Sequence, residues 1–209
     1  MIIHNNNVII DISKKERVEK IYHSNINRKD NYKANLLDCI SQKECEICHK
    51  KIYSHLYSIH YNAHPTEIFS WLYLGTFDNA CDIEELRRIK VTHVLNCAIE
   101  CKNETLPKDI KELHLNIHDY EGFELFEYFE RANDFMNGCK INGGVVLVHC
   151  KYGISRSVAF VIAYLIKYMK YTVDYAIKFL MDKRKKIKPN EGFMDQLYIY
   201  QKYYYGKGK

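Results

Sequence analysis

The sequence predicts an α/β fold, in which a central, mostly parallel, twisted sheet is flanked by helices. The apolar, β-branched runs at 91–97 and 145–148 have the composition of buried strands. Segments between such runs carry apolar residues at helical spacing, so strands and helices alternate along the chain. We predict that this domain covers residues 65–209 and that residues 1–64 form an N-terminal extension.

The first half of the predicted domain begins with a strand over 67–74. Asp78 is placed to cap a helix that continues to Lys90, because apolar residues recur on one face of that segment. Two further strands are expected, over 91–97 and 112–117. The first of these is apolar along its length, so it should lie at the centre of the sheet.

The second half of the domain is expected to contribute more helices than strands. Apolar residues at helical spacing predict a helix over 123–137, which Gly138 would close. Thr172 is placed to cap a helix over 173–183. A last helix is expected over 192–205.

Length and composition exclude several classes of protein. The chain has 209 residues, of which 47% are hydrophobic, enough for one domain with a sizeable core and an extension. A net charge of +5 is too small to indicate nucleic-acid binding. The longest apolar run, 158–166, is far below the roughly 18 residues that a membrane span needs, so we expect no membrane segment.

Eight cysteines occur without a secretory signal, because the N-terminus runs into asparagines rather than a basic region and an apolar run. Cysteines in this context are typical of reduced thiols in the cytoplasm or the nucleus, which is where we expect the protein. A thiol that acts as a nucleophile also needs a reducing compartment to survive.

Nine residues between a predicted strand and a predicted helix, His149–Ser157, carry the strongest functional signal. A buried strand leads into Cys150, and a buried helix follows Arg156. Backbone N–H groups in a loop that enters a helix bind anions. The same positive field favours the thiolate form of Cys150 near neutral pH. Gly153 permits close backbone approach or a positive φ.

This loop is predicted to bind a phosphate group. Arg156 offers a planar fork that can hold two oxygens of one phosphate, while amides of the loop face the same anion. The residues predicted to hold the phosphate are Lys151, Tyr152, Gly153, Ile154, Ser155 and Arg156. Thiolate, amides and guanidinium together describe nucleophilic attack on a phosphate ester. A buried structural cysteine beside a surface cation is the weaker alternative.

The chemistry also requires a general acid, because a Ser, Thr or Tyr oxygen leaves poorly unless it is protonated as the P–O bond breaks. Asp119 is preferred because it lies at the end of the strand predicted over 112–117. Glu121 and Glu124 are the alternatives for this role. A capping or solvated aspartate is the non-functional interpretation of Asp119.

The segment His149–Ser157 resembles the catalytic loop of cysteine-dependent protein tyrosine phosphatases, and its Ile-Ser-Arg-Ser ending resembles the dual-specificity branch. Further pieces that resemble the family occur in the same order, at 72–75, 91–96, 144–157 and 188–193. The resemblance covers about 65–205, leaves out the N-terminal extension, and implies the dual-specificity phosphatase-like form of the α/β fold.

The resemblance implies a protein phosphatase that hydrolyses phosphotyrosine and phosphoserine or phosphothreonine through a cysteinyl-phosphate. The residues that it assigns to catalysis are Cys150, Arg156, Asp119 and Ser157. Ser157 would hydrogen-bond the departing thiolate, and His149 would shape the surroundings of the sulfur. We expect Ser155 to order the loop through backbone hydrogen bonds. No metal or cofactor is required, because Arg156 and the amides neutralise the phosphate charge.

The loop departs from the family at two positions. Tyr152 stands where a small alanine is usual, and Lys151 precedes it, as in the lipid-phosphatase branch. That branch usually carries a second loop lysine, where this chain has Ile154. We therefore expect phosphoprotein substrates, such as a protein kinase. The alternatives are another phosphate ester, such as a phosphoinositide, and a module that binds phosphoproteins without cleaving them.

A basic run at 183–188 ends one of the predicted helices. We interpret it as a solvated helix end that the macrodipole stabilises. A docking patch for acidic phosphorylated substrates and a nuclear signal are the alternatives.

The N-terminal extension contains a Cys/His pattern that admits two interpretations. Cys45 and Cys48 are followed by His60 and His64, and this C-x2-C-x11-H-x3-H spacing could supply the tetrahedral ligands of a structural zinc. The alternative is an amphipathic helix that packs against the main domain through Ile52, Leu56, Ile59 and His60. Residues 1–35 are predicted to be weakly ordered.

Overall fold

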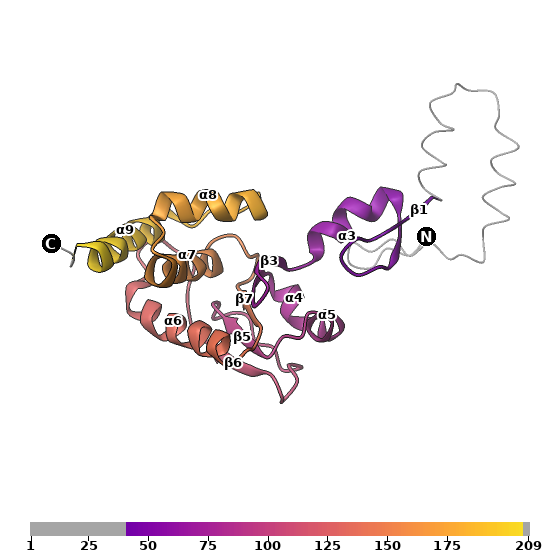
Figure 1. Cartoon of the computed structure of the whole chain (residues 1–209), viewed down its shortest axis with the longest axis horizontal. Coiled ribbons are helices and arrows are strands. Elements are labelled where there is room, and N and C mark those ends of the chain that lie inside the picture. The colour runs from indigo at the N-terminus through magenta and orange to yellow at the C-terminus, as the bar shows by residue number, and fades with distance from the viewer. Residues whose placement is uncertain (1–40, 207–209) are drawn as a thin grey trace, which may run out of the picture. The chain divides into compact units, whose positions relative to one another are not determined.

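The computed structural model describes residues 41–206 of the chain. Residues 1–35, for which weak order is predicted, lie outside the described residues. The chain forms two compact units, a small N-terminal one and a larger α/β domain (Figure 1). Pro65, the predicted domain boundary, lies between the last helix of the N-terminal segment and the first strand of the α/β domain.

The N-terminal unit contains a two-stranded hairpin followed by short helical segments. β1 (Gln42–Glu44) pairs antiparallel with β2 (Lys51–Tyr53). A 3₁₀ turn, Ser54–Leu56, then leads into α3 (Tyr57–Ala63). The order of elements is therefore strand, strand, helix.

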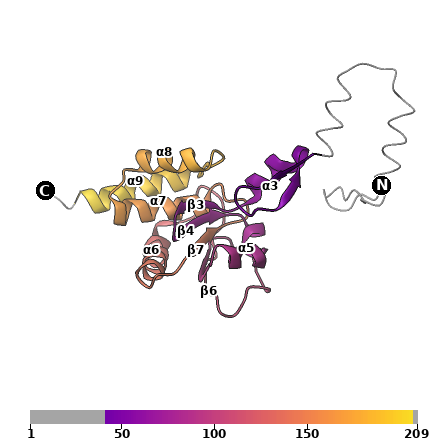
Figure 2. The same ribbon diagram turned by 45° about the vertical axis from the view of Figure 1, so that its right-hand side comes forward.

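A five-stranded sheet in the order β3-β4-β7-β5-β6 organises the larger unit (Figure 2). Its strands are β3 (Thr66–Phe69), β4 (Leu72–Gly75), β5 (His93–Asn96), β6 (Lys111–His114) and β7 (Val146–His149). Only β3 and β4 pair antiparallel in this sheet, and every other pairing is parallel. The predicted central, mostly parallel sheet is confirmed.

The two runs predicted as buried strands become β5 and β7, which lie inside the sheet. β7 pairs with β4 on one side and β5 on the other, and all four of its residues are buried. A strand covered on both faces needs apolar side chains pointing both ways, which explains the unbroken apolar run that leads to His149.

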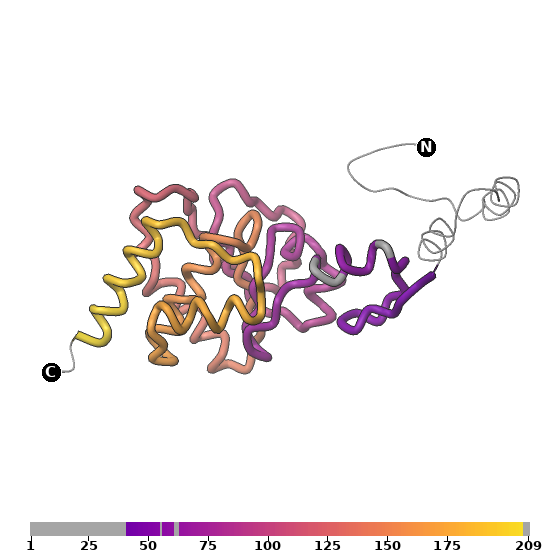
Figure 3. Tube along the Cα trace, turned by 90° about the horizontal axis from the view of Figure 1, so that it is seen from above, coloured from indigo at the N-terminus to yellow at the C-terminus, as the bar shows by residue number. Residues whose placement is uncertain are grey.

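Helices cover the sheet, and most of one helix is buried among the others. They are α4 (Phe77–Cys81), α5 (Ile83–Arg88), α6 (Phe126–Ile141), α7 (Arg156–Met169), α8 (Val173–Lys183) and α9 (Glu191–Tyr205). Figures 1 and 3 show α7 among α6, α8 and α9. Residues 158–166 are all buried, which explains why α7 is apolar around its whole circumference.

Two of the predicted elements are each divided in the structure. The single strand predicted over 67–74 is the β3–β4 hairpin, whose turn lies at Ser70 and Trp71 without the glycine or proline that would have signalled it. The helix predicted from Asp78 to Lys90 is two helices. Thr76 caps the first, and Asp82 caps the second by accepting a 3.0 Å hydrogen bond from the Glu85 N–H.

The other helix predictions fit more closely. Thr172 caps α8 as expected, accepting a 3.2 Å hydrogen bond from the Tyr175 N–H. The predicted end of α6 at Gly138 is wrong, because the helix continues to Ile141 and Gly138 lies inside it. Within the described residues, no helix has the length and hydropathy required to cross a membrane.

Candidate active site

The loop between β7 and α7 forms the floor of a cavity of about 370 Å³. Cys150 and Arg156 line it and are only 2% and 3% exposed. Asp119 and Tyr152 line the same cavity from the side and the rim. The segments that follow β6 and β7 meet here because parallel strands place their carboxyl ends at one edge of the sheet. A third stretch, 188–191 at the start of α9, also lines the cavity.

The sulfur of Cys150 receives two hydrogen bonds from its own loop and helix. The Gly153 N–H donates to Sγ at 3.3 Å, and the Ser157 hydroxyl donates at 3.2 Å. Both donors therefore point at the atom that would attack a phosphate ester. The position of Ser157 agrees with its predicted contact to the sulfur.

Gly153 is required by the backbone at this point of the loop. Its φ is +65°, in the region where side chains are strained. A Cβ there would also lie 2.6 Å from the carbonyl oxygen of Gly75, at the end of β4. The loop can therefore turn its amide toward the sulfur only with glycine at this position.

Glu100, which the sequence analysis did not single out, holds the guanidinium of Arg156. Nη1 and Nη2 of Arg156 donate to the two carboxylate oxygens of Glu100, each at 2.7 Å, and Nη1 also donates to the Ile117 carbonyl at 3.0 Å. The hydrogen bonds from Arg156 lower the pKa of Glu100 to about 2, so this carboxylate remains charged at any physiological pH.

One edge of the Arg156 guanidinium is left for a ligand. Nε is among the few buried side-chain polar atoms of the described chain without a hydrogen bond. The nearest carboxylate atom, Oδ2 of Asp119, is 3.5 Å away. A tetrahedral anion bound over the loop would supply the acceptor that Nε lacks.

Asp119 is held at the cavity by two side chains. Its Oδ1 accepts hydrogen bonds from the Ser155 hydroxyl at 2.7 Å and from the Asn190 amide at 3.0 Å. We expected Ser155 to order the loop through backbone hydrogen bonds. Its hydroxyl accepts from the backbone N–H of Asn190 at 3.3 Å and also donates to Asp119, so it links the acid to the loop.

Asn190 is a second residue that the sequence analysis missed, since it was interpreted only as part of a turn. Its Oδ1 accepts from the Phe193 N–H at 2.9 Å and caps α9, while its Nδ2 donates to Asp119. The sequence signal for the cap was present, because asparagine favours this position. The contact to Asp119, 71 residues away, had no local signal.

The alternative acids are less well placed than Asp119. Glu121 lines the cavity but is exposed, and Glu124 lies outside the lining. Only Asp119, of the three carboxylates, lies beside Arg156 and is fixed by neighbouring donors.

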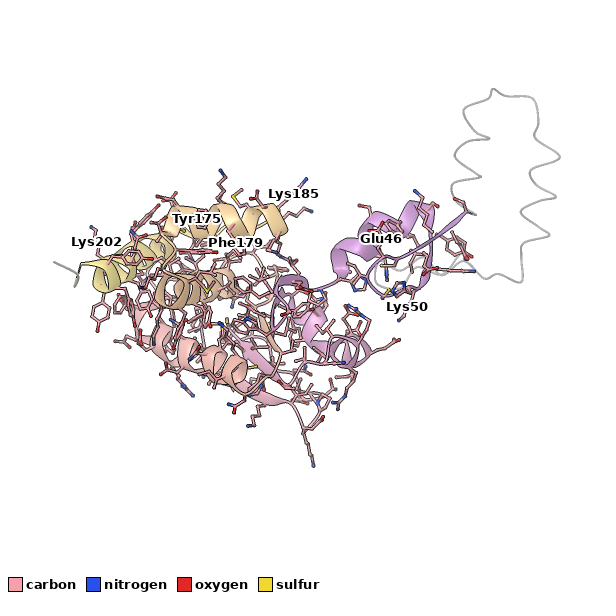
Figure 4. All side chains as sticks on the ribbon, in the orientation of Figure 1. Glu46, Lys50, Tyr175, Phe179, Lys185 and Lys202 are labelled. Atoms are coloured by element: carbon pink, nitrogen blue, oxygen red, sulfur yellow. The ribbon has the colours of Figure 1, made fainter. Side chains whose placement is uncertain are left out.

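Part of the basic run at 183–188 has a structural role, which corrects its interpretation as a wholly solvated helix end. Arg184 is partly buried, donates from Nε to the Gly153 carbonyl at 3.1 Å, and donates from Nη1 to Thr66 at 3.0 Å. Burial lowers its pKa. Lys185, by contrast, is exposed and points away from the domain (Figure 4).

The two unusual loop residues are exposed at the mouth of the site. The Tyr152 side chain is 61% exposed, and the Lys151 ammonium lies 5.2 Å from the centre of its ring. Tyr152 and Ile154 line the cavity, whereas Lys151 lies outside its lining. A cation over an aromatic face stabilises the position of the ring, here beside the cavity.

His149 lies behind the sulfur at the end of β7. It is fully buried, and burial lowers its pKa to about 4, so its imidazole is neutral near pH 7. A neutral, buried imidazole fits the predicted role in shaping the site, without proton transfer.

A protein-family model, the dual specificity phosphatase catalytic domain, matches residues 72–203. The chain belongs to the dual-specificity phosphatase family. A protein phosphatase Slingshot homolog from Xenopus laevis is 41% identical over 137 residues, 66% of this chain and 20% of that protein. Dual specificity protein phosphatase 19 from Mus musculus is 40% identical over 131 residues, 63% of this chain and 59% of that protein.

Solved structures agree with the family assignment. The crystal structure of DUSP15 has a TM-score of 0.64 and 30% identity, covering 66% of this chain and 88% of that chain. Human DUSP28 also has a TM-score of 0.64, with 28% identity, and covers 66% of this chain and 93% of its own. The chain therefore spans most of the length of these two solved structures but only about a fifth of the Slingshot homolog.

The contacts of Arg184 predict that it positions the loop. Arg184→Met should lower kcat/KM for p-nitrophenyl phosphate by about 10-fold or more, because the charged hydrogen bond to the Gly153 carbonyl is lost. Lys185→Met is the matched control, since it removes an exposed cation next to Arg184. Equal activity of the two variants would contradict this role.

The buried imidazole predicts a pH-dependent stability. Because the pKa of His149 is lower in the folded chain than in the unfolded chain, the unfolded chain binds more protons as the pH falls. Urea unfolding should show a loss of about 2 kcal/mol between about pH 7.5 and about pH 5. His149→Asn should remove this part of the slope, and exposed His118→Asn should retain it. An unchanged slope in the His149 variant would show that the imidazole is not held neutral.

Proposed function

We propose that this chain is a protein phosphatase that hydrolyses phosphotyrosine and phosphoserine or phosphothreonine through a cysteinyl-phosphate intermediate. The observation that carries the proposal is that Cys150, Arg156 and Asp119 line one cavity, with Nε of Arg156 3.5 Å from Oδ2 of Asp119. These are a nucleophile, an anion clamp and an acid within reach of one phosphate group.

In the first step, the Cys150 thiolate attacks phosphorus opposite the leaving oxygen. An S–P bond forms while the P–O bond to the substrate breaks, and Asp119 donates its proton to the departing oxygen. Arg156 and the loop amides bind the non-bridging phosphate oxygens and stabilise their negative charge in the transition state. Glu100 keeps the guanidinium turned toward the phosphate.

In the second step, water hydrolyses the cysteinyl-phosphate. The Asp119 carboxylate takes a proton from water as its oxygen attacks phosphorus, and the S–P bond breaks. The Ser157 hydroxyl and the Gly153 N–H, which already donate to the sulfur, stabilise the thiolate as it leaves. Inorganic phosphate is released, and Asp119 again carries the proton for the next cycle.

Phosphoproteins are the substrates that the site favours over other phosphate esters. The Tyr152 ring beside the cavity can pack against an aromatic or peptide substrate. Ile154 stands where a second cation would favour a polyphosphorylated headgroup. We further propose that the protein acts in the cytoplasm or the nucleus on phosphorylated signalling proteins such as kinases.

Substitution of the nucleophile and the acid tests the mechanism. Cys150→Ser should abolish hydrolysis of p-nitrophenyl phosphate, since a serine hydroxyl is not ionised there. Asp119→Asn should slow hydrolysis of a phosphopeptide by about 10²–10⁴, the usual contribution of general acid catalysis. Glu121→Gln and Glu124→Gln serve as controls for the two alternative acids and should stay near full activity.

The opposite pattern would overturn these assignments. Near-full activity of Asp119→Asn, with a large loss in Glu121→Gln, would move the acid role to Glu121. Binding of phosphopeptides by the unmodified chain with no hydrolysis, and no inhibition by vanadate, would establish a binding module instead of an enzyme.

The exposed ring of Tyr152 predicts a contribution to substrate choice. A panel of peptides that carry phosphotyrosine, phosphothreonine or both should be hydrolysed more readily than a soluble phosphoinositide. Tyr152→Ala should raise KM for phosphotyrosine peptides by about 3-fold to 10-fold through the lost ring contact, with less effect on p-nitrophenyl phosphate. A phosphoinositide preference in the unmodified chain would refute the proposed substrate class.

A further inference from the structure

Four cysteine and histidine side chains of the N-terminal segment converge in the structure. Cys45, Cys48, His60 and His64 each offer one ligand atom, and these atoms all lie within 4.8 Å of one another. The Cys48 sulfur is 3.2 Å from Nε2 of His60. Ligand atoms around a tetrahedral zinc are separated by about 3.5 Å, as follows from bond lengths of about 2.0–2.3 Å. We propose that these four residues bind a structural Zn²⁺ ion.

The local fold presents the two cysteines on one side of a tight turn. Figure 4 labels Glu46 and Lys50, which lie in the turn that joins β1 and β2. The Cys45 N–H donates to the Lys50 carbonyl at 2.9 Å, and the His49 N–H donates to the Cys45 carbonyl at 2.8 Å. His49 has φ of +59°, which reverses the chain directly after Cys48. Both sulfurs therefore belong to a closed turn, as in a zinc knuckle.

The histidines come from the helix that follows the hairpin. His60 lies in α3, and His64 directly follows its end. Residues four positions apart lie on one face of a helix, so both imidazoles can reach the same point. The hairpin turn thus supplies two cysteine ligands, and the helix and its end supply two histidine ligands.

The described side chains of residues 41–63 form no apolar core that would hold the hairpin and the helix together. Among the described side chains of residues 41–63, Cys45 alone is fully buried. Ile59 and Leu56, which the amphipathic-helix interpretation would bury, are 70% and 39% exposed. Segments of this length seldom fold on apolar burial alone, whereas a bound metal supplies the missing free energy. The absence of a core thus favours zinc over a packed amphipathic helix.

His64 contacts a carboxylate through the ring nitrogen opposite the one that would bind the metal, as metal-bound histidines usually do. Nδ1 of His64 lies 2.8 Å from Oε1 of Glu85, so Nε2 would be the nitrogen that binds the metal. Glu85 is buried, and Arg88 donates to both of its oxygens, at 2.8 Å from Nε and 2.6 Å from Nη2. A carboxylate that accepts from the second ring nitrogen fixes the tautomer and orientation of a zinc-binding histidine.

The chemistry of the ligand set also indicates the role of the ion. Two thiolates and two imidazoles suit zinc better than magnesium or calcium, which prefer oxygen ligands. Four protein ligands leave no open position for water or substrate, so the ion would stabilise structure and take no part in catalysis. The proposal is independent of the phosphatase chemistry.

Metal analysis of the full chain, purified without a histidine tag, tests the proposal. We expect about one zinc per chain, retained through gel filtration. Cys48→Ser and His60→Asn should each lower the zinc content by about 10-fold or more at equal chelator concentration. Cys81→Ser removes an exposed thiol outside the cluster, and His49→Asn removes the neighbouring exposed histidine, so both should retain the ion.

A second measurement uses the unmodified chain, so it does not depend on how variants fold. The chain is stripped with a chelator and titrated with Co²⁺, which should bind at one equivalent with the intense visible absorption of a tetrahedral thiolate site. Zinc should then displace the cobalt signal. The proposal is overturned if the chain retains no zinc and gives no tetrahedral cobalt spectrum, or if Cys48→Ser retains a full equivalent of zinc.

Discussion

The arrangement of the site depends on one buried guanidinium being held from behind. Glu100 and the Ile117 carbonyl accept hydrogen bonds from Nη1 and Nη2 of Arg156, while its Nε makes no hydrogen bond. Burial of a charge is tolerated because a carboxylate and a carbonyl satisfy it. Since Arg156 is also the first residue of α7, the same contacts fix where the helix begins and where the loop of Cys150 must close.

A second set of contacts ties the acid to this loop. Asp119 is bound by Ser155 of the loop and by Asn190, which caps α9. The segment around Asp119 also packs closely on α9, because a Cβ at Gly192 would collide with the Glu121 carbonyl. The acid is therefore placed by the nucleophile loop and by the end of the domain together. The nucleophile, the clamp and the acid belong to one hydrogen-bonded network.

The two units of the chain differ in how they are stabilised. The α/β domain is built around a central sheet and α7, whose residues 156–166 are all buried, and this apolar surface is ample for a stable core. The hairpin and helix of the N-terminal unit bury little besides Cys45 and gather four soft or borderline ligands instead. One chain thus combines a domain stabilised by apolar burial with a segment suited to stabilisation by metal.

The sequence by itself determined the α/β class, the interior strands β5 and β7, the buried helix α7 and the loop that carries Cys150 and Arg156. Each of these features depends on the composition of one segment or on the spacing of residues within it, so the sequence pattern of that segment is enough to predict it. Tertiary structure alone decided the contacts of Glu100 with Arg156, of Asn190 with Asp119 and of Arg184 with Gly153. Each joins residues 31 or more positions apart. Such pairings arise only when sheet order brings strand ends and loops together, so no local pattern encodes them.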